Sequence, residues 1–132
     1  MKIAIILYLI ILSSFFILSC SKTKDDNNCI SYSNSPVINI QGPNSGLVNQ
    51  DFVITLTYGI SNGCGEFDHL EKSVSGNTTT INVIGKYTGC ICTQVYKEEQ
   101  TVYTFKATTA GTYYLKFFKE NNIPVMDTIL VQ

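Results

Sequence analysis

The amino-acid sequence predicts an all-β domain, an antiparallel sandwich of about seven strands. Three observations favour this fold class: apolar and polar residues alternate in several short segments, turn-forming residues separate those segments, and no segment shows apolar residues at helical spacing with caps at both ends. Two facing sheets bury the apolar face of each strand, which a single sheet of this length could not do.

The predicted strands follow one another along residues 36–132, which we take as one domain. Most of them carry apolar residues at every second position, so one face turns toward the core. In chain order the segments are residues 37–40, 52–58, 67–74, 81–87, 103–107, 113–118 and 125–131. The third segment alternates least regularly. The side chains expected on the core faces are Phe52, Ile54, Leu56, Tyr58, Ile81, Val83, Tyr87, Tyr103, Phe105, Ala107, Tyr113, Leu115, Phe117, Val125, Ile129 and Val131.

Turn-forming clusters lie between these segments. Residues 42–46, 61–63, 75–77 and 120–122 are rich in Gly, Asn, Ser or Pro, which favour turns for different backbone reasons. This succession of short strands and turns is typical of an immunoglobulin-like sandwich. The chain has no Trp, so the inner-face Trp of antibody domains is missing and only the broad architecture is predicted. A small barrel is the alternative.

Composition restricts the classes of function. Charged residues make up 14% of the chain, the 9 basic residues are all Lys, and the formal net charge is -1, so no basic patch favours nucleic acid. The single histidine, His69, is the only imidazole available as a catalytic base, and no Gly-x-Ser-x-Gly or phosphate-binding loop is present. We therefore expect a protein without enzymatic activity and without a cofactor.

Residues 1–19 have the pattern of a secretory signal peptide. Lys2 precedes an uncharged, mostly apolar run over residues 3–18, which is shorter than the roughly twenty apolar residues that a membrane-spanning helix needs. The run ends in Ile17-Leu18-Ser19-Cys20, which resembles the lipobox of bacterial lipoproteins. This resemblance implies cleavage before Cys20 and lipidation of Cys20, and two or three lipid chains hold a protein stably on a membrane. The alternative is an uncleaved transmembrane anchor.

Residues 20–35 are expected to form a flexible tether that begins at the lipidated Cys20. Residues 21–28 contain no apolar side chain, so they cannot bury surface to offset the entropy of ordering. Within them, Lys24-Asp25-Asp26 resembles the surface-export signal of Bacteroidetes lipoproteins, and a solvated spacer is the alternative. We expect a cell-envelope protein, lipid-anchored to the outer membrane of a Gram-negative bacterium, on its periplasmic or its outer face.

Three further resemblances point to bacterial envelope proteins. Residues 110–115, Ala-Gly-Thr-Tyr-Tyr-Leu, resemble the Gly-x-Tyr-x-Leu strand found late in many bacterial immunoglobulin-like repeats. Residues 62–65 and 89–94 are similar to segments of small, uncharacterised Bacteroidetes lipoproteins, a group that implies no activity. Residues 127–129, Asp-Thr-Ile, resemble the acceptor of the Bacteroidetes O-glycosylation system, which implies a glycan on Thr128.

Of the 5 cysteines, Cys20 is assigned to the lipid, which leaves an even set. An even set in an oxidising envelope predicts two disulfides. Cys90 and Cys92 are two residues apart, and on an extended strand the distance between their Cα atoms is close to the largest that a disulfide allows. A bridge between these two is therefore disfavoured. Cys64 is then expected to pair with one of these two and Cys29 with the other.

The same residues allow an alternative hypothesis, an envelope metal-handling protein. Thiolates of Cys64, Cys90 and Cys92 with the imidazole of His69 would suit Cu(I) or Zn(II). Against it, envelope thiols are usually oxidised, and acidic residues around His69 indicate an exposed polar strand instead of a ligand shell.

By exclusion, the sequence favours a non-catalytic binding module for a protein or glycan partner. The longest irregular segment, residues 88–100, is expected to be fixed at its base by a disulfide and to present Val95 and Tyr96. The alternative is that both side chains pack back on the core. A further hypothesis is a protease-inhibitor-like immunoglobulin domain that offers this loop to a protease. No pattern in the sequence indicates which oligomeric state the protein has.

Overall fold

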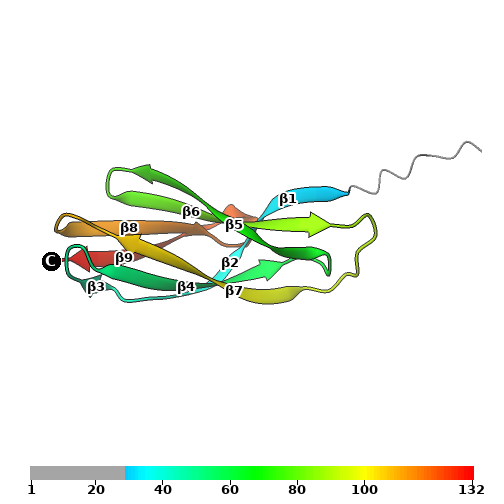
Figure 1. Ribbon diagram of the computed structural model, residues 1–132, viewed down its shortest axis with the longest axis horizontal. Helices are drawn as coiled ribbons and strands as arrows, with labels where there is room; N and C mark the ends of the chain where they lie inside the picture. The colour runs from blue at the N-terminus through cyan, green and yellow to red at the C-terminus, as the bar shows by residue number, and fades with distance from the viewer. Residues whose placement is uncertain (1–28) are drawn as a thin grey trace, which may run out of the picture.

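The computed structural model describes residues 29–132, which form two β-sheets packed face to face (Figure 1). The predicted signal peptide, Cys20 and residues 21–28 lie outside the described residues. The strands are β1 (Ile30–Ser35), β2 (Val37–Gln41), β3 (Ser45–Gly46), β4 (Asp51–Ile60), β5 (Gly65–Ser75), β6 (Thr78–Thr88), β7 (Lys97–Lys106), β8 (Gly111–Phe118) and β9 (Pro124–Val131), with a 3-10 turn η2 (Glu120–Asn122). The predicted all-β sandwich is confirmed, with β1 and the short β3 added to the predicted strands.

The two sheets differ in size and in strand order. The smaller sheet has the order β2–β4–β7, and both pairs are antiparallel. In the larger sheet, β5 pairs with β6 along nearly all of its length. The other edge of β6 is shared by two strands. Strand β1 pairs with residues 83–88, and β8 pairs with residues 78–80. Strands β9 and β3 extend this sheet beyond β8.

Two short pairs are parallel, which the sequence analysis did not predict. Strand β8 runs parallel to β6, and β3 runs parallel to β9. The chain leaves β6 for β7 in the smaller sheet and then returns to β8 in the larger one. One strand in the opposite sheet therefore separates β6 from β8, and β8 enters the larger sheet in the same direction as β6.

The core lies between the sheets and follows the predicted alternation. Along β4, every second residue from Phe52 to Tyr58 is buried, and β6, β8 and β9 repeat this pattern. The buried cluster consists of Val37, Phe52, Ile54, Leu56, Tyr58, Ile60, Ile81, Val83, Tyr87, Phe105, Ala107, Leu115, Phe117, Ile129 and Val131. Tyr103, Tyr113 and Val125, which were also expected in the core, are only partly buried.

Strand β1 corrects the predicted extent of the tether, which was expected to run to residue 35. Residues 30–35 pair with β6 in an antiparallel register from Ile30–Thr88 to Ser35–Val83. Their alternation is weak because Ser and Asn fill most positions and only Ser35 is buried. Main-chain pairing, which leaves little trace in the pattern of side chains, is what orders this segment.

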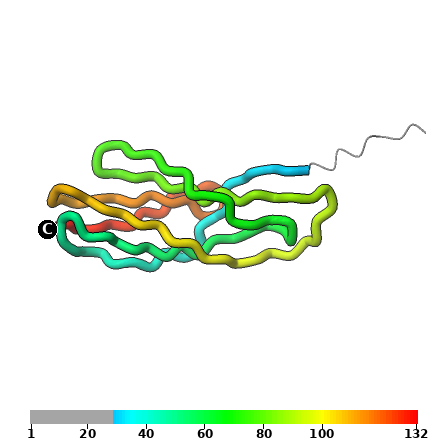
Figure 2. Tube along the Cα trace, viewed as in Figure 1, coloured from blue at the N-terminus to red at the C-terminus, as the bar shows by residue number. Residues whose placement is uncertain are grey.

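The chain enters and ends at opposite ends of an elongated sandwich (Figure 2). Residue 29 lies at one end, which we call the entry end, together with the connection between β6 and β7. At the other end the amide of the last residue, Gln132, donates to the carbonyl oxygen of Gly46 at 2.9 Å. Within residues 29–132, no helix has the length and apolar character needed to cross a membrane.

Candidate functional site

Two disulfides hold the connection between β6 and β7, residues 89–96, which we call the braced loop. Cys29 is bonded to Cys90 with a Cα–Cα distance of 5.0 Å, and Cys64 is bonded to Cys92 with a Cα–Cα distance of 5.5 Å. The prediction that Cys29 and Cys64 each pair with one of the two neighbouring cysteines is confirmed. The structure also selects between the two connectivities that the sequence left open.

Backbone hydrogen bonds fix the braced loop on both sides. The Gly89 amide donates to the Cys29 carbonyl oxygen at 2.8 Å, and the Gly63 amide donates to the Thr93 carbonyl oxygen at 2.9 Å. Gly89 has φ +138°, and a Cβ there would lie 3.0 Å from the Cys64 sulfur. A side chain at this position would therefore be both strained and crowded, so the glycine lets the disulfide close beside it.

The braced loop is shorter than predicted, and its apolar side chains are exposed. Residues 97–100, expected in the irregular segment, belong to β7. Val95 and Tyr96 are 52% and 57% exposed, and Ile91, which the sequence analysis did not single out, is 96% exposed. Both neighbours of Ile91, Cys90 and Cys92, are held by disulfides to other parts of the fold, so the Ile91 side chain cannot fold back onto the core.

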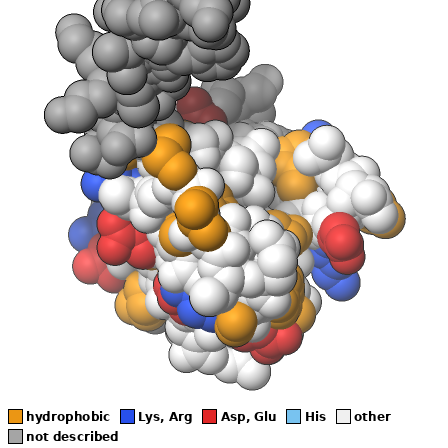
Figure 3. All heavy atoms as spheres, turned by 90° about the vertical axis from the view of Figure 1, so that its right-hand side faces the viewer, with side chains coloured by type: hydrophobic (Ala, Val, Ile, Leu, Met, Phe, Trp, Pro, Cys, Tyr) orange, Lys and Arg blue, Asp and Glu red, His pale blue; other side chains and the backbone are white. Residues whose placement is uncertain are grey.

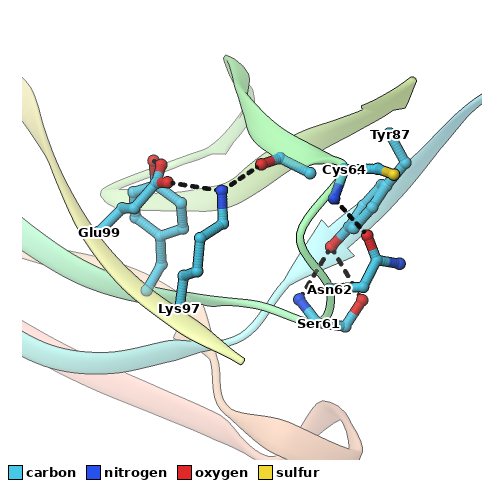
Figure 4. Close-up of polar contacts among 8 residues, drawn as sticks. Ser61, Asn62, Cys64, Tyr87, Lys97 and Glu99 are labelled. Atoms are coloured by element: carbon cyan, nitrogen blue, oxygen red, sulfur yellow. Dashed lines mark hydrogen bonds and ion pairs between the residues drawn. The ribbon is translucent and has the colours of Figure 1, made fainter. Parts of the chain in front are cut away.

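A chain of polar contacts ties the start of β7, where the braced loop ends, to the start of β5 and to β4 (Figure 4). The Lys97 ammonium donates to the Gly65 carbonyl oxygen at 2.6 Å and lies 3.3 Å from the Glu99 carboxylate. The Tyr58 hydroxyl donates to the same carboxylate at 3.0 Å. Burial of Tyr58 raises its pKa, and the hydrogen bond to the negative Glu99 raises it further.

A pocket of about 400 Å³ lies beside the loop, where the chain turns from β1 into β2. We call it the corner pocket. It is lined by Ser33, Asn34, Ser35, Pro36, Gly59, Ser61, Tyr87, Tyr96, Phe118, Lys119, Glu120, Asn121 and Asn122. These residues come from five separate stretches of the chain, and most of them carry hydroxyl, amide or charged groups. The lining is thus mixed, with aromatic carbon beside many hydrogen-bonding groups.

Tyr96 forms one wall of the corner pocket because Gly59 leaves room for it. Gly59 is buried, and a Cβ on it would collide with the Tyr96 hydroxyl. Tyr96 also lines a smaller adjacent hollow of about 270 Å³. Burial raises the pKa of Tyr96, with smaller contributions from the carboxylates of Glu98 and Glu120, so its hydroxyl stays neutral and able to donate.

Two hydroxyl groups occur deeper in the corner pocket. Ser35 is 3% exposed, and its Oγ is the one buried side-chain oxygen or nitrogen in residues 29–132 without a hydrogen-bond partner. The Tyr87 hydroxyl accepts hydrogen bonds from the amide and the hydroxyl of Ser61. Burial raises the pKa of Tyr87, but these bonds, together with the nearby hydroxyls of Ser33 and Ser35, favour its phenolate and the net pKa is lowered. The Ser35 hydroxyl is closed off from solvent and belongs to the inner wall of the pocket, so the polar groups open to a ligand are those of exposed residues such as Asn34 and Glu120.

The structure does not assemble the ligand set of the metal-handling hypothesis. The sulfurs of Cys64, Cys90 and Cys92 are in disulfides, so they are not thiolates. His69 is exposed on β5, where its Nδ1 lies 2.6 Å from the Asp68 carboxylate. Among the residues that the structure describes, no three His, Cys, Asp or Glu side chains are grouped as a metal site would require.

Of two further predicted sites, Thr128 and Cys20, the structure describes only Thr128. Thr128 is exposed on β9, and its amide donates to the Asp127 carboxylate at 2.9 Å. Cys20, the predicted site of lipidation, lies outside the described residues.

The fold and the disulfides define a small, covalently braced β-sandwich domain. Comparison with known families agrees: the model of the ORF11 beta-sandwich domain matches residues 54–131, from β4 to the end of β9. The chain belongs to this family. No curated protein and no solved structure is significantly similar to it.

Proposed function

We propose that the protein is a lipid-anchored, non-catalytic binding module of the cell envelope, and that the corner pocket takes a hydroxylated ligand such as the terminal sugar of a glycan. The observation that carries the proposal is a half-exposed Tyr96 ring that shares one hollow with the exposed polar side chains of Asn34 and Glu120. The pocket volume of about 400 Å³ is in the range of small-molecule sites.

The chemistry of the lining favours a sugar over an apolar ligand. A sugar ring presents C–H groups on its faces and hydroxyl groups around its edge. Tyr96 provides an aromatic surface for the C–H groups, while the exposed Asn34 and Glu120 provide donors and acceptors for the hydroxyls. An apolar ligand would leave these polar groups without partners, which is unfavourable.

The envelope location rests on the sequence and is consistent with the disulfides. The lipobox-like residues 17–20 favour a lipid at Cys20, and the resemblance of Lys24-Asp25-Asp26 to the surface-export signal of Bacteroidetes lipoproteins favours the outer membrane. Two disulfides in a domain of this size are typical of proteins that fold in an oxidising compartment.

The alternative hypotheses have less support. Metal handling would need the thiolates that the disulfides consume. Inhibition of a protease would need free access to the braced loop, which lies at the end where the tether joins the domain.

A glycan array probed with the mature full chain in detergent tests the proposal. We expect retention on a restricted set of sugars, and we expect Tyr96→Ala to weaken that binding about tenfold through loss of the stacking surface. Tyr114→Ala, which removes an exposed tyrosine of β8 outside the pocket, is the matched control and should bind as the unaltered chain does. Absence of any retained sugar, or equal weakening by both substitutions, would contradict the proposal.

A further inference from the structure

We infer that the tip of the braced loop contacts the lipid surface on which the protein is anchored, with Ile91 and Val95 entering the interfacial region of the bilayer. This inference rests on the proposed lipid anchor at Cys20. It adds an orientation: the entry end of the sandwich faces the membrane, and the end that carries β3 and the carboxyl terminus points away from it.

The inference first requires that the braced loop lie close to the lipid, and this follows from the length of the tether and the place where it ends. Cys29, where the described chain begins, is bonded to Cys90 in the braced loop itself. Only 8 residues, Ser21 to Asn28, separate Cys20 from Cys29. A chain of this length spans at most roughly 30 Å when fully extended and about half of that as a flexible coil. The loop is therefore held within a short distance of the lipid chains.

The exposed apolar side chains carry the second part of the inference. Ile91 is 96% exposed, Val95 is 52% exposed, and Ile30, which follows Cys29, is 42% exposed. Figure 3 looks onto this end and shows apolar side chains separated by polar ones. An exposed isoleucine between two disulfide-bonded cysteines is unfavourable in water, and transfer to the acyl boundary removes that apolar surface from water.

The charges at this end favour apolar contact over attraction to anionic headgroups. Lys97 is engaged by the Gly65 carbonyl oxygen and the Glu99 carboxylate. Lys86 lies 4.0 Å from the Glu66 carboxylate. Both of these lysines are paired with carboxylates, and next to the loop Lys119 is offset by Glu98 and Glu120, which lie near Tyr96, so contact with the membrane should depend little on lipid charge.

The corner pocket stays open in this orientation. One side of it is formed by η2 and its flanking residues at the turn between β8 and β9, which lies away from the tip of the loop (Figure 1). A ligand can therefore reach the corner pocket while the loop tip contacts lipid.

The absence of Trp from the sequence permits a direct test by fluorescence. The full lipidated chain carrying Ile91→Trp would be reconstituted into phosphatidylcholine vesicles with bromine on the acyl chains, which quenches nearby indole emission. We expect emission to fall at least twofold relative to unbrominated vesicles. Leu47→Trp is the matched control, because Leu47 is 64% exposed next to β3, at the far end, and its emission should not change.

The outcomes separate this inference from the proposed anchor. If the protein does not float with the vesicles, the lipid anchor is absent and the inference falls with it. If the protein floats but Ile91→Trp and a second variant, Val95→Trp, both emit equally in the two kinds of vesicle, the anchor stands and the membrane-facing loop is wrong. Quenching that appears only with anionic lipids would likewise overturn the apolar contact inferred here.

Discussion

At the scale of single residues, Tyr58 shows how a core side chain can be linked to charge. It is 1% exposed, yet its hydroxyl donates to the Glu99 carboxylate at 3.0 Å. Burial, followed by this contact, raises the pKa of Tyr58 in the folded protein. In the unfolded chain the group titrates near pH 10. Its contribution to stability is therefore complete below pH 10 and is lost as the pH rises above 10 toward the folded pKa.

Tyr58→Phe should flatten the dependence of stability on pH in the alkaline range. For the unaltered chain we expect the free energy of unfolding to fall above pH 10, with a contribution from Tyr58 of up to about 1.4 kcal/mol per pH unit. The variant loses this contribution but keeps the buried ring. Urea unfolding at pH 9, 10 and 11 measures both slopes, and identical slopes in the two proteins would show that Tyr58 is not the linked group.

Ser35→Ala should stabilise the domain and leave ligand binding unchanged. The Ser35 hydroxyl is buried without a partner, so its removal should raise the free energy of unfolding by about 1 kcal/mol. The same hydroxyl is closed off from solvent, so affinity for any sugar found on the array should stay the same. Chemical unfolding and a binding isotherm check the two effects. A loss of stability would mean that the hydroxyl has a partner within the fold.

At the scale of elements, the two disulfides tie strands that are far apart in the chain. The Cys64–Cys92 bridge spans 28 residues and joins the start of β5 to the braced loop. The Cys29–Cys90 bridge spans 61 residues and holds the start of β1. Since loop-closure entropy grows with the logarithm of loop length, the second bridge should stabilise slightly more than the first.

Removal of each bridge as a pair tests this difference. We expect Cys64→Ala with Cys92→Ala to lower the free energy of unfolding by about 3.5 kcal/mol, and Cys29→Ala with Cys90→Ala to lower it by about 4 kcal/mol. Guanidinium unfolding without reductant measures both.

The single substitution Cys64→Ala tests the connectivity. It should expose only the Cys92 thiol to alkylation, because Cys29 and Cys90 remain bonded to each other. Alkylation at Cys90 in this variant would show that the pairing is wrong.

Elements differ in how well the sequence predicts them, and the reason is physical. Strand β4 was predicted because Phe52, Ile54 and Leu56 repeat with period two against a single buried face. Strand β1 was not predicted, because its Ser and Asn residues carry no such pattern and its order comes from pairing with β6 and from Cys29. Cysteine spacing excluded one pairing, but the choice between the other two depends on where the strands meet in space.

At the scale of the whole molecule, the corner pocket could not be predicted from local patterns. It forms where the turn from β1 to β2, the end of β4, Tyr96 and the turn between β8 and β9 come together. Tyr96 was predicted as a contact residue from the irregular segment around it. The place of Ser35 in the pocket wall was not predicted, because its burial depends on a crossing between the two sheets at Pro36, whose carbonyl oxygen accepts from the Gly59 amide at 2.9 Å.

The described part of the molecule is thus a braced sandwich whose first residue, Cys29, and braced loop share one end, while the pocket opens on its side. If the proposed anchor is correct, the membrane, the disulfides and the ligand site are ordered along the long axis. A partner or glycan on a neighbouring surface would approach from the side or from the end that carries β3.

Mass analysis of the mature protein, extracted from membranes and mapped by peptides without reduction, tests this arrangement most directly. We predict a chain that begins at Cys20 and carries lipid there, with Cys29 linked to Cys90 and Cys64 linked to Cys92. A chain that retains residues 1–19 without lipid would contradict the anchor, and cysteines that alkylate before reduction would contradict the braced loop.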